Sequence, residues 1–123
     1  MPEFNFVLLH VEDHAASAAL YHELLGIPIV EQKPDISILP LREGVMLGLW
    51  SRDTVEPAST GRTGASEIAF AVADAASVEA AHAEWTRRDL TIVQAPTRMS
   101  FGTTFVALDP DGHRLRVFAP AAA

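Results

Sequence analysis

The 123-residue sequence contains no cysteine. Disulfide bonds, thiolate metal sites and a cysteine nucleophile are therefore excluded together. A long apolar run is also lacking, because the amino-terminal segment MPEFNFVLLHVED has neither a basic start nor enough consecutive apolar residues for a signal peptide or a membrane span. These absences predict a cytoplasmic protein with no membrane partner.

Positive charge is scarce as well. Nine basic residues stand against 16 acidic ones, for a formal net charge of −7. Such a chain repels phosphate backbones, so nucleic acid is not expected as a partner. With 49% apolar and 20% charged residues, the chain is typical of an ordered globular protein, and residues 1–123 fit a single domain.

The predicted elements occur twice in the same order. Asp13 and Asp74, 61 positions apart, each end a strand and precede a helix as an N-cap. The first copy is predicted as a strand, a helix and three strands at residues 4–11, 14–25, 27–30, 36–41 and 45–50. The second copy is predicted at residues 66–74, 75–88, 90–94, 102–108 and 113–118.

This repeat sets the expected organisation. A first module spans residues 4–50, a second module spans 65–119, and the segment 51–64, rich in Ser, Thr, Gly and Pro, reads as a linker. Two similar half-sheets that bury each other's faces give an α+β fold.

The stretch 109–118, DPDGHRLRVF, joins a turn to the last strand. Asp109 and Gly112 are turn residues, since Asp bonds its own backbone and Gly accepts a positive φ. Alternation along the strand places Arg114, Arg116 and Phe118 on one face. His113 is expected at the surface, within the turn.

Several motifs together resemble the vicinal oxygen chelate superfamily, which includes glyoxalase I, the extradiol dioxygenases and the fosfomycin, bleomycin and mitomycin resistance proteins. They are the doubled βαβββ pattern, a V-x-D before each helix, and the stretches LYHELLG at 20–26 and DPDGHRL at 109–115. The resemblance covers residues 4–119. It implies two βαβββ modules that form a cupped mixed sheet, and a homodimer whose chains share modules.

The resemblance also says where a metal would bind. Family metalloenzymes use a His or Gln, a His and a Glu at positions that correspond here to Phe6, Glu67 and Arg116. An aromatic ring cannot ligate a metal and an arginine stays protonated, so only Glu67 remains. No metal and no cofactor are therefore expected, and His10 is expected to line a pocket rather than to bind a metal.

Without a metal, the inward faces of the cup suggest a site for a planar aromatic ligand. Small residues would leave space and rings would supply flat apolar surfaces. Arg116 either pairs with Glu67 or binds a ligand carboxylate. The predicted ligand-binding residues are Phe6, Leu8, His10, Met46, Gly48, Trp50, Ser51, Glu67, Met99, Phe101, Arg116 and Phe118. Ser51 is expected at the rim, and Met99 and Phe101 form either a lid or an ordinary loop packed on the sheet edge.

The leading hypothesis is a metal-free protein that sequesters a planar aromatic antibiotic or secondary metabolite, with no catalytic residue. Mitomycin-, bleomycin- and phenazine-type ligands are the candidates that the resemblance implies. One alternative is a metal-dependent lyase, isomerase or dioxygenase that uses His10 and Glu67. Another is a metal-free acid/base catalyst with Glu67 as the base.

Overall fold

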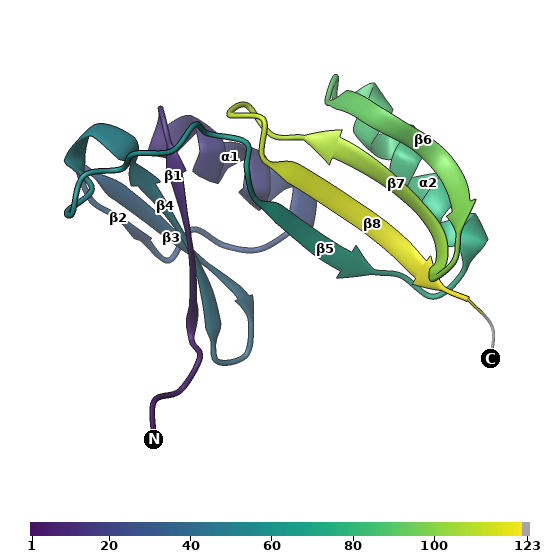
Figure 1. The fold of residues 1–123 in the computed structure, drawn as a ribbon, viewed down its shortest axis with the longest axis horizontal. Helices are drawn as coiled ribbons and strands as arrows, with labels where there is room; N and C mark the ends of the chain where they lie inside the picture. The colour runs from purple at the N-terminus through teal and green to yellow at the C-terminus, as the bar shows by residue number, and fades with distance from the viewer. Residues whose placement is uncertain (122–123) are drawn as a thin grey trace. The chain divides into compact units, whose positions relative to one another are not determined.

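The computed structural model describes residues 1–121 and divides the chain into two compact units, Met1–Thr63 and the chain from Gly64 onward. Each unit has one long helix and a four-stranded sheet that mixes parallel and antiparallel pairs (Figure 1). This arrangement confirms the α+β class and the doubled βαβββ order. No helix within residues 1–121 is long and apolar enough to cross a membrane.

The N-terminal unit has the sheet order β1-β4-β3-β2. Strand β1 runs parallel to β4, and the other pairs are antiparallel. Its elements are β1 (Phe6–Val11), α1 (His14–Leu25), β2 (Glu31–Gln32), β3 (Ile36–Arg42), β4 (Val45–Ser51) and the 3-10 helix η1 (Arg52–Thr54).

Helix α1 begins and ends where its capping residues predict. The Asp13 carboxylate accepts a hydrogen bond from Ala16 N at 3.1 Å, and Gly26 adopts a φ of 67° that favours glycine. The helix packs on β3 and β4, and its most buried residues are Ser17, Ala18 and Tyr21. The leucines of this helix, Leu20, Leu24 and Leu25, are only half-buried.

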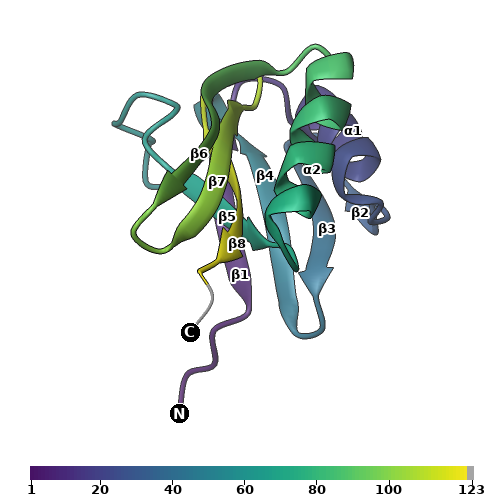
Figure 2. The same cartoon turned by 90° about the vertical axis from the view of Figure 1, so that its right-hand side faces the viewer.

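The C-terminal unit repeats the pattern with the order β5-β8-β7-β6 and a parallel β5–β8 pair. Helix α2 lies along one face of this sheet (Figure 2) and packs on β6, β7 and β8. Trp85 is buried there with its ring centroid 5.3 Å from that of Phe105, so it belongs to the core of this unit. The elements are β5 (Glu67–Ala71), α2 (Ala75–Arg87), β6 (Thr91–Met99), β7 (Gly102–Leu108) and β8 (Arg114–Pro120).

The DPDG turn is a hydrogen-bonded loop around a buried carboxylate. Asp109 Oδ1 accepts the backbone N–H groups of Asp111 at 2.9 Å and His113 at 2.8 Å, while Gly112 has a φ of 81°. The expectation of a surface His113 is wrong. Its side chain is buried and its Nδ1 lies 2.5 Å from Ser66 Oγ, because this turn folds onto the start of β5.

Two strands differ from the sequence-based expectation. The strand expected at 27–30 lies instead at Glu31–Gln32, since Pro28 has no N–H to donate to a ladder. Strand β6 continues past residue 94 to Met99, with irregular register on both sides of Gln94. The segment after β4 begins with η1 and contains the buried Val55.

Candidate ligand-binding site

One face of the N-terminal sheet brings six of the predicted residues together. The β1–β4 register pairs Phe6 with Met46, Leu8 with Gly48 and His10 with Trp50, so all six side-chain positions share a face. The opposite face carries the buried Leu47 and Leu49 and is covered by α1.

A cavity of about 400 Å³ opens on this face. It is lined by Phe6, Leu8, Lys33, Asp35, Ile36 and Trp50. Three of these were predicted, and the turn between β2 and β3 supplies residues that sequence reasoning missed. The signal that could have revealed them is the register of β3, which pairs Ile36 with Trp50 and so carries the preceding Pro34-Asp35 turn to the cavity.

The Trp50 ring is fixed from the side by His10. The two rings meet edge to face with centroids 6.3 Å apart and an interplanar angle of 88°. A hydrogen bond of 2.9 Å joins His10 Nδ1 to Ser59 Oγ on the segment after β4. His10 therefore orients the cavity wall and is not itself one of the lining residues.

Gly48 has a different role from the expected one. A Cβ at this position would lie 2.5 Å from Leu8 Cδ2 and 3.2 Å from Phe6 Cε1. The space that glycine leaves is thus filled by these two side chains, which lie across β4 and form part of the cavity lining. Met46 shares their face but does not line the cavity.

Ser51 is placed away from this cavity. It pairs with Val11, and alternation puts both on the face that α1 covers. Its backbone N–H donates to Asp35 O at 2.8 Å, which ties the end of β4 to the turn before β3. Among the N-terminal residues predicted to bind ligand, Ser51 alone lies on that face.

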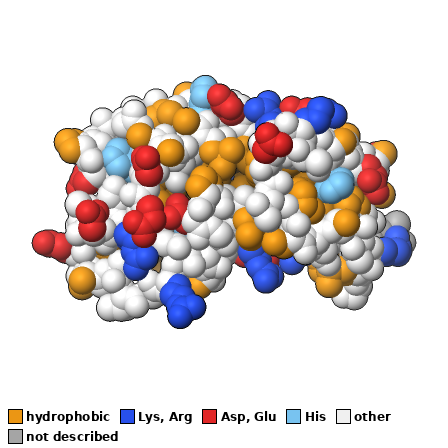
Figure 3. Space-filling view, turned by 90° about the horizontal axis from the view of Figure 1, so that it is seen from above, with side chains coloured by type: hydrophobic (Ala, Val, Ile, Leu, Met, Phe, Trp, Pro, Cys, Tyr) orange, Lys and Arg blue, Asp and Glu red, His pale blue; other side chains and the backbone are white. Residues whose placement is uncertain are grey.

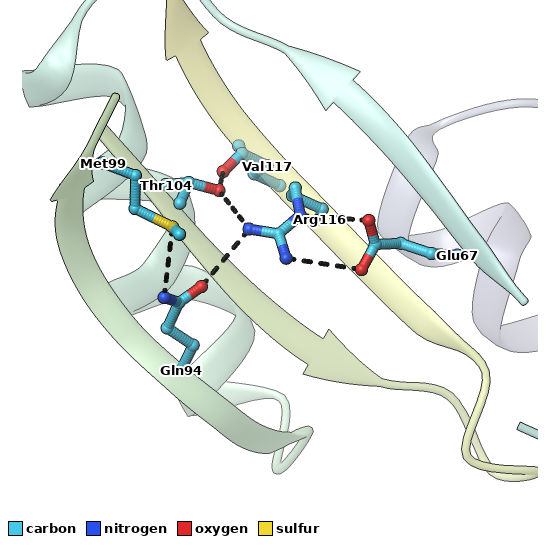
Figure 4. Close-up of polar contacts among 6 residues, drawn as sticks. All are labelled: Glu67, Gln94, Met99, Thr104, Arg116 and Val117. Carbon is cyan, nitrogen blue, oxygen red and sulfur yellow. Dashed lines mark hydrogen bonds and ion pairs between the residues drawn. The ribbon is translucent and has the colours of Figure 1, made fainter. Parts of the chain in front are cut away.

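On the sheet face of the C-terminal unit that α2 does not cover, Arg116 forms hydrogen bonds with three neighbouring side chains (Figure 4). Its guanidinium donates to both oxygens of Glu67, from Nε at 3.1 Å and from Nη2 at 3.4 Å. Nη1 donates to Gln94 Oε1 at 3.3 Å and to Thr104 Oγ1 at 3.2 Å. The Thr104 hydroxyl in turn donates to Val117 O at 2.8 Å.

These contacts use four of the five N–H donors of the arginine. Of the two expectations for Arg116, pairing with Glu67 is the one seen, and a ligand carboxylate would have to displace Glu67 to bind in the same way. The Arg116 guanidinium also lies 5.8 Å from the centre of the Phe101 ring, which meets Phe118 edge to face at 6.2 Å. The Met99 sulfur accepts a hydrogen bond from Gln94 Nε2 at 3.5 Å.

The residues at the family's metal positions do not fit a metal. Phe6 has no lone pair, and Arg116 is a cation already bound to Glu67, which leaves one carboxylate where three or four ligands are the rule. Within residues 1–121 no group of three or more His, Asp or Glu side chains is arranged to hold an ion.

Comparison with known proteins agrees with this fold. The family model of the Glyoxalase/Bleomycin resistance protein/Dioxygenase superfamily matches residues 3–117. A phenazine antibiotic resistance protein of Enterobacter agglomerans is 27% identical over 116 residues, 92% of this chain and 88% of that protein.

Solved structures give the same result. Protein ATC0852 of Agrobacterium tumefaciens is 43% identical, with a TM-score of 0.89 over 99% of this chain and all of that one. A glyoxalase/bleomycin resistance protein/dioxygenase of Nocardioides shares the fold, with a TM-score of 0.83 at 19% identity over all of this chain and 86% of that one. The chain therefore belongs to the glyoxalase/bleomycin resistance protein/dioxygenase superfamily.

Proposed function

We propose that this protein binds and sequesters a planar aromatic antibiotic or secondary metabolite, without a metal ion and without changing it chemically. The observation that carries the proposal is the cavity of about 400 Å³ with Phe6 and Trp50 in its lining. Two aromatic rings and the apolar side chains of Leu8 and Ile36 offer a ring-shaped ligand both stacking and burial.

Two further observations support binding rather than chemistry. The relative from Enterobacter agglomerans is a phenazine antibiotic resistance protein, so at least one similar chain is linked to resistance against an aromatic antibiotic. The acid that a metal-free enzyme would use as a base, Glu67, is held by two hydrogen bonds from Arg116. Both oxygens of this carboxylate are therefore already engaged by a cation.

Fluorescence of Trp50 tests the proposal directly. The variant Trp85→Phe removes the buried indole of the C-terminal unit and leaves Trp50 as the only tryptophan. Titration with phenazine should then quench the emission in a saturable manner, because a stacked ligand lies against the ring. Calorimetry on the unmodified protein supplies the affinity independently.

Two substitutions at the same position separate stacking from simple burial. Trp50→Phe keeps an aromatic ring and should retain most of the affinity. Trp50→Ala should lower it by about tenfold, since an aromatic contact contributes about 0.5–1.5 kcal/mol and about 1.4 kcal/mol corresponds to a factor of ten. Saturable binding by no planar aromatic compound, or equal affinity in Trp50→Ala, would contradict the proposal.

The metalloenzyme alternative is tested by metal analysis of protein purified without a histidine tag. We expect less than one tenth of a Zn, Ni, Mn or Fe ion per chain, because the donor set described above is incomplete. Stoichiometric metal would favour the hypothesis of a metal-dependent lyase, isomerase or dioxygenase over the binding function. Product formation that is lost in Glu67→Gln would instead favour acid/base catalysis.

We also propose that the protein works as a homodimer. Large apolar side chains are exposed on the single chain, among them Leu8, Val93, Met99 and Phe101. A second copy is a natural cover for such surface. Sedimentation equilibrium at micromolar concentration should give twice the chain mass, 26.6 kDa against 13.3 kDa for one chain, and a monomer mass would overturn this point.

A further inference from the structure

The cavity of the N-terminal unit contains an acidic side chain that no other described group neutralises. Asp35 is half-buried and lines the cavity beside Ile36 and Trp50. Within residues 1–121, no hydrogen bond or ion pair reaches its carboxylate, and its backbone oxygen alone is engaged, by Ser51 N at 2.8 Å. A half-buried carboxylate beside aromatic rings gains most from a cationic or N–H donor.

The other charged lining residue is already paired. Lys33 Nζ lies 3.3 Å from Glu31 Oε1 at the end of the same turn. Taken together, Glu31, Lys33 and Asp35 carry one positive and two negative charges, so the mouth of the cavity has a net charge of −1 (1 − 2). An approaching ligand therefore meets an acceptor that lacks a partner and a lysine that has one.

The turn that carries Asp35 is held in place by helix α1. His14 Nε2 donates to Pro34 O at 2.9 Å, and His14 Nδ1 lies 2.7 Å from Ser37 Oγ. Gln32 Nε2 donates to the same hydroxyl at 2.9 Å. With both ends of a two-residue turn bonded in this way, the carboxylate is positioned before any ligand arrives.

The net charge of the whole N-terminal unit also favours a cationic ligand. Residues 1–63 contain nine acidic and four basic side chains, a formal net charge of −5 (4 − 9). Figure 3 shows acidic side chains gathered over the left part of the molecule, which belongs to this unit. Such a field attracts cations and repels anions as they approach.

We propose that Asp35 makes this cavity selective for planar aromatic ligands that carry a protonated amine or a ring N–H. The ring stacks within the cavity beside Phe6 and Trp50, and the nitrogen donates to the Asp35 carboxylate. The proposal rests on the proposed function of the cavity and adds the chemical class of ligand. It predicts discrimination against aromatic carboxylates of the same shape.

Three tricyclic compounds of matched shape test this selectivity at pH 8. They are 9-aminoacridine, a cation, acridine, which is neutral, and acridine-9-carboxylate, an anion. Calorimetry on the full chain should give an affinity for the cation about 5- to 10-fold above that for neutral acridine, the size expected of a charged hydrogen bond to a half-buried group. The anion should bind most weakly.

Two variants with the same change in net charge locate the effect. Asp35→Asn should remove the preference for the cation, so that the variant binds 9-aminoacridine and acridine with affinities within about twofold of each other. Asp53→Asn, on the exposed helix η1 outside the cavity, should leave the preference within about twofold of the unmodified protein. Circular dichroism of each variant verifies that it is folded.

The outcomes separate the two proposals. Equal affinities for the three compounds, tighter binding of the carboxylate, or a cation preference that survives Asp35→Asn would overturn the role of Asp35 while leaving the binding function intact. If none of the three compounds binds to the protein, the proposed function fails and this selectivity fails with it.

Discussion

The Glu67–Arg116 pair allows a quantitative test of how the C-terminal unit is held together. Glu67→Gln, Arg116→Met and the double variant form a thermodynamic cycle that isolates the free energy of the pair. The Glu67 and Arg116 side chains are 38% and 17% exposed. Because exposed pairs contribute about 0.2–1 kcal/mol and this one has two bonds and a largely buried cation, we expect a coupling of about 1–1.5 kcal/mol.

Arg116→Met should lower stability further than the coupling alone. The variant also loses the hydrogen bonds to Gln94 and Thr104, each worth about 0.5–1 kcal/mol, for a total of about 2–3.5 kcal/mol. With a urea dependence of about 1.5 kcal/mol per M, the unfolding midpoint should fall by about 1.3–2.3 M.

The assay uses the single tryptophan of each unit. In a Trp50→Phe background, the fluorescence of Trp85, buried against Phe105, reports unfolding of the C-terminal unit only. Arg114→Met is the matched control, since Arg114 lies two residues away on the same strand and is exposed. A coupling below about 0.3 kcal/mol, or an equal loss of stability in Arg114→Met, would refute the reasoning.

Three other substitutions have outcomes set by local geometry. Gly102→Ala should destabilise the C-terminal unit by about 3–4 kcal/mol in urea unfolding, because a Cβ would lie 1.9 Å from Ala119 O. Asp109→Ala leaves two backbone N–H groups of the DPDG turn without their acceptor and should cost about 2–3 kcal/mol by the same measurement. Hydrogen bonds from the Ser77 hydroxyl and N–H hold the pKa of Asp74 below its ordinary 3.8. The contribution of this carboxylate to folding stability is therefore complete above pH 3.8 and is lost as the pH falls through the lower folded-state pKa. Asp74→Asn should reduce this loss of stability in acid unfolding curves.

Local chemistry made much of the fold predictable. Each N-cap aspartate precedes its helix by one residue, and the alternation of Arg116 and Val117 on β8 matches their exposure. These features depend on contacts within a few residues, which a sequence displays directly. The doubled order of elements, which is also a sequence property, gave the family.

The candidate site was less predictable because it depends on register across strands. Asp35 and Lys33 line the cavity only because β3 pairs with β4 in one particular alignment. Arg116 also donates to Gln94 and Thr104, which come from the irregular strand β6 and its neighbour β7. A simple alternation rule cannot anticipate a partner on a strand whose register shifts.

The parallel pairing of β1 with β4 also has a kinetic consequence. Forty residues separate Phe6 from Met46, whereas the β3–β4 hairpin turns between Arg42 and Val45. Short loops close quickly and long ones slowly, so we expect the hairpin to form first and β1 to dock last. Substitutions in β1 should then mainly accelerate unfolding. The strand that supplies Phe6 and Leu8 to the cavity should then be the first to detach. We therefore expect the detachment of this one strand to limit the lifetime of a bound ligand.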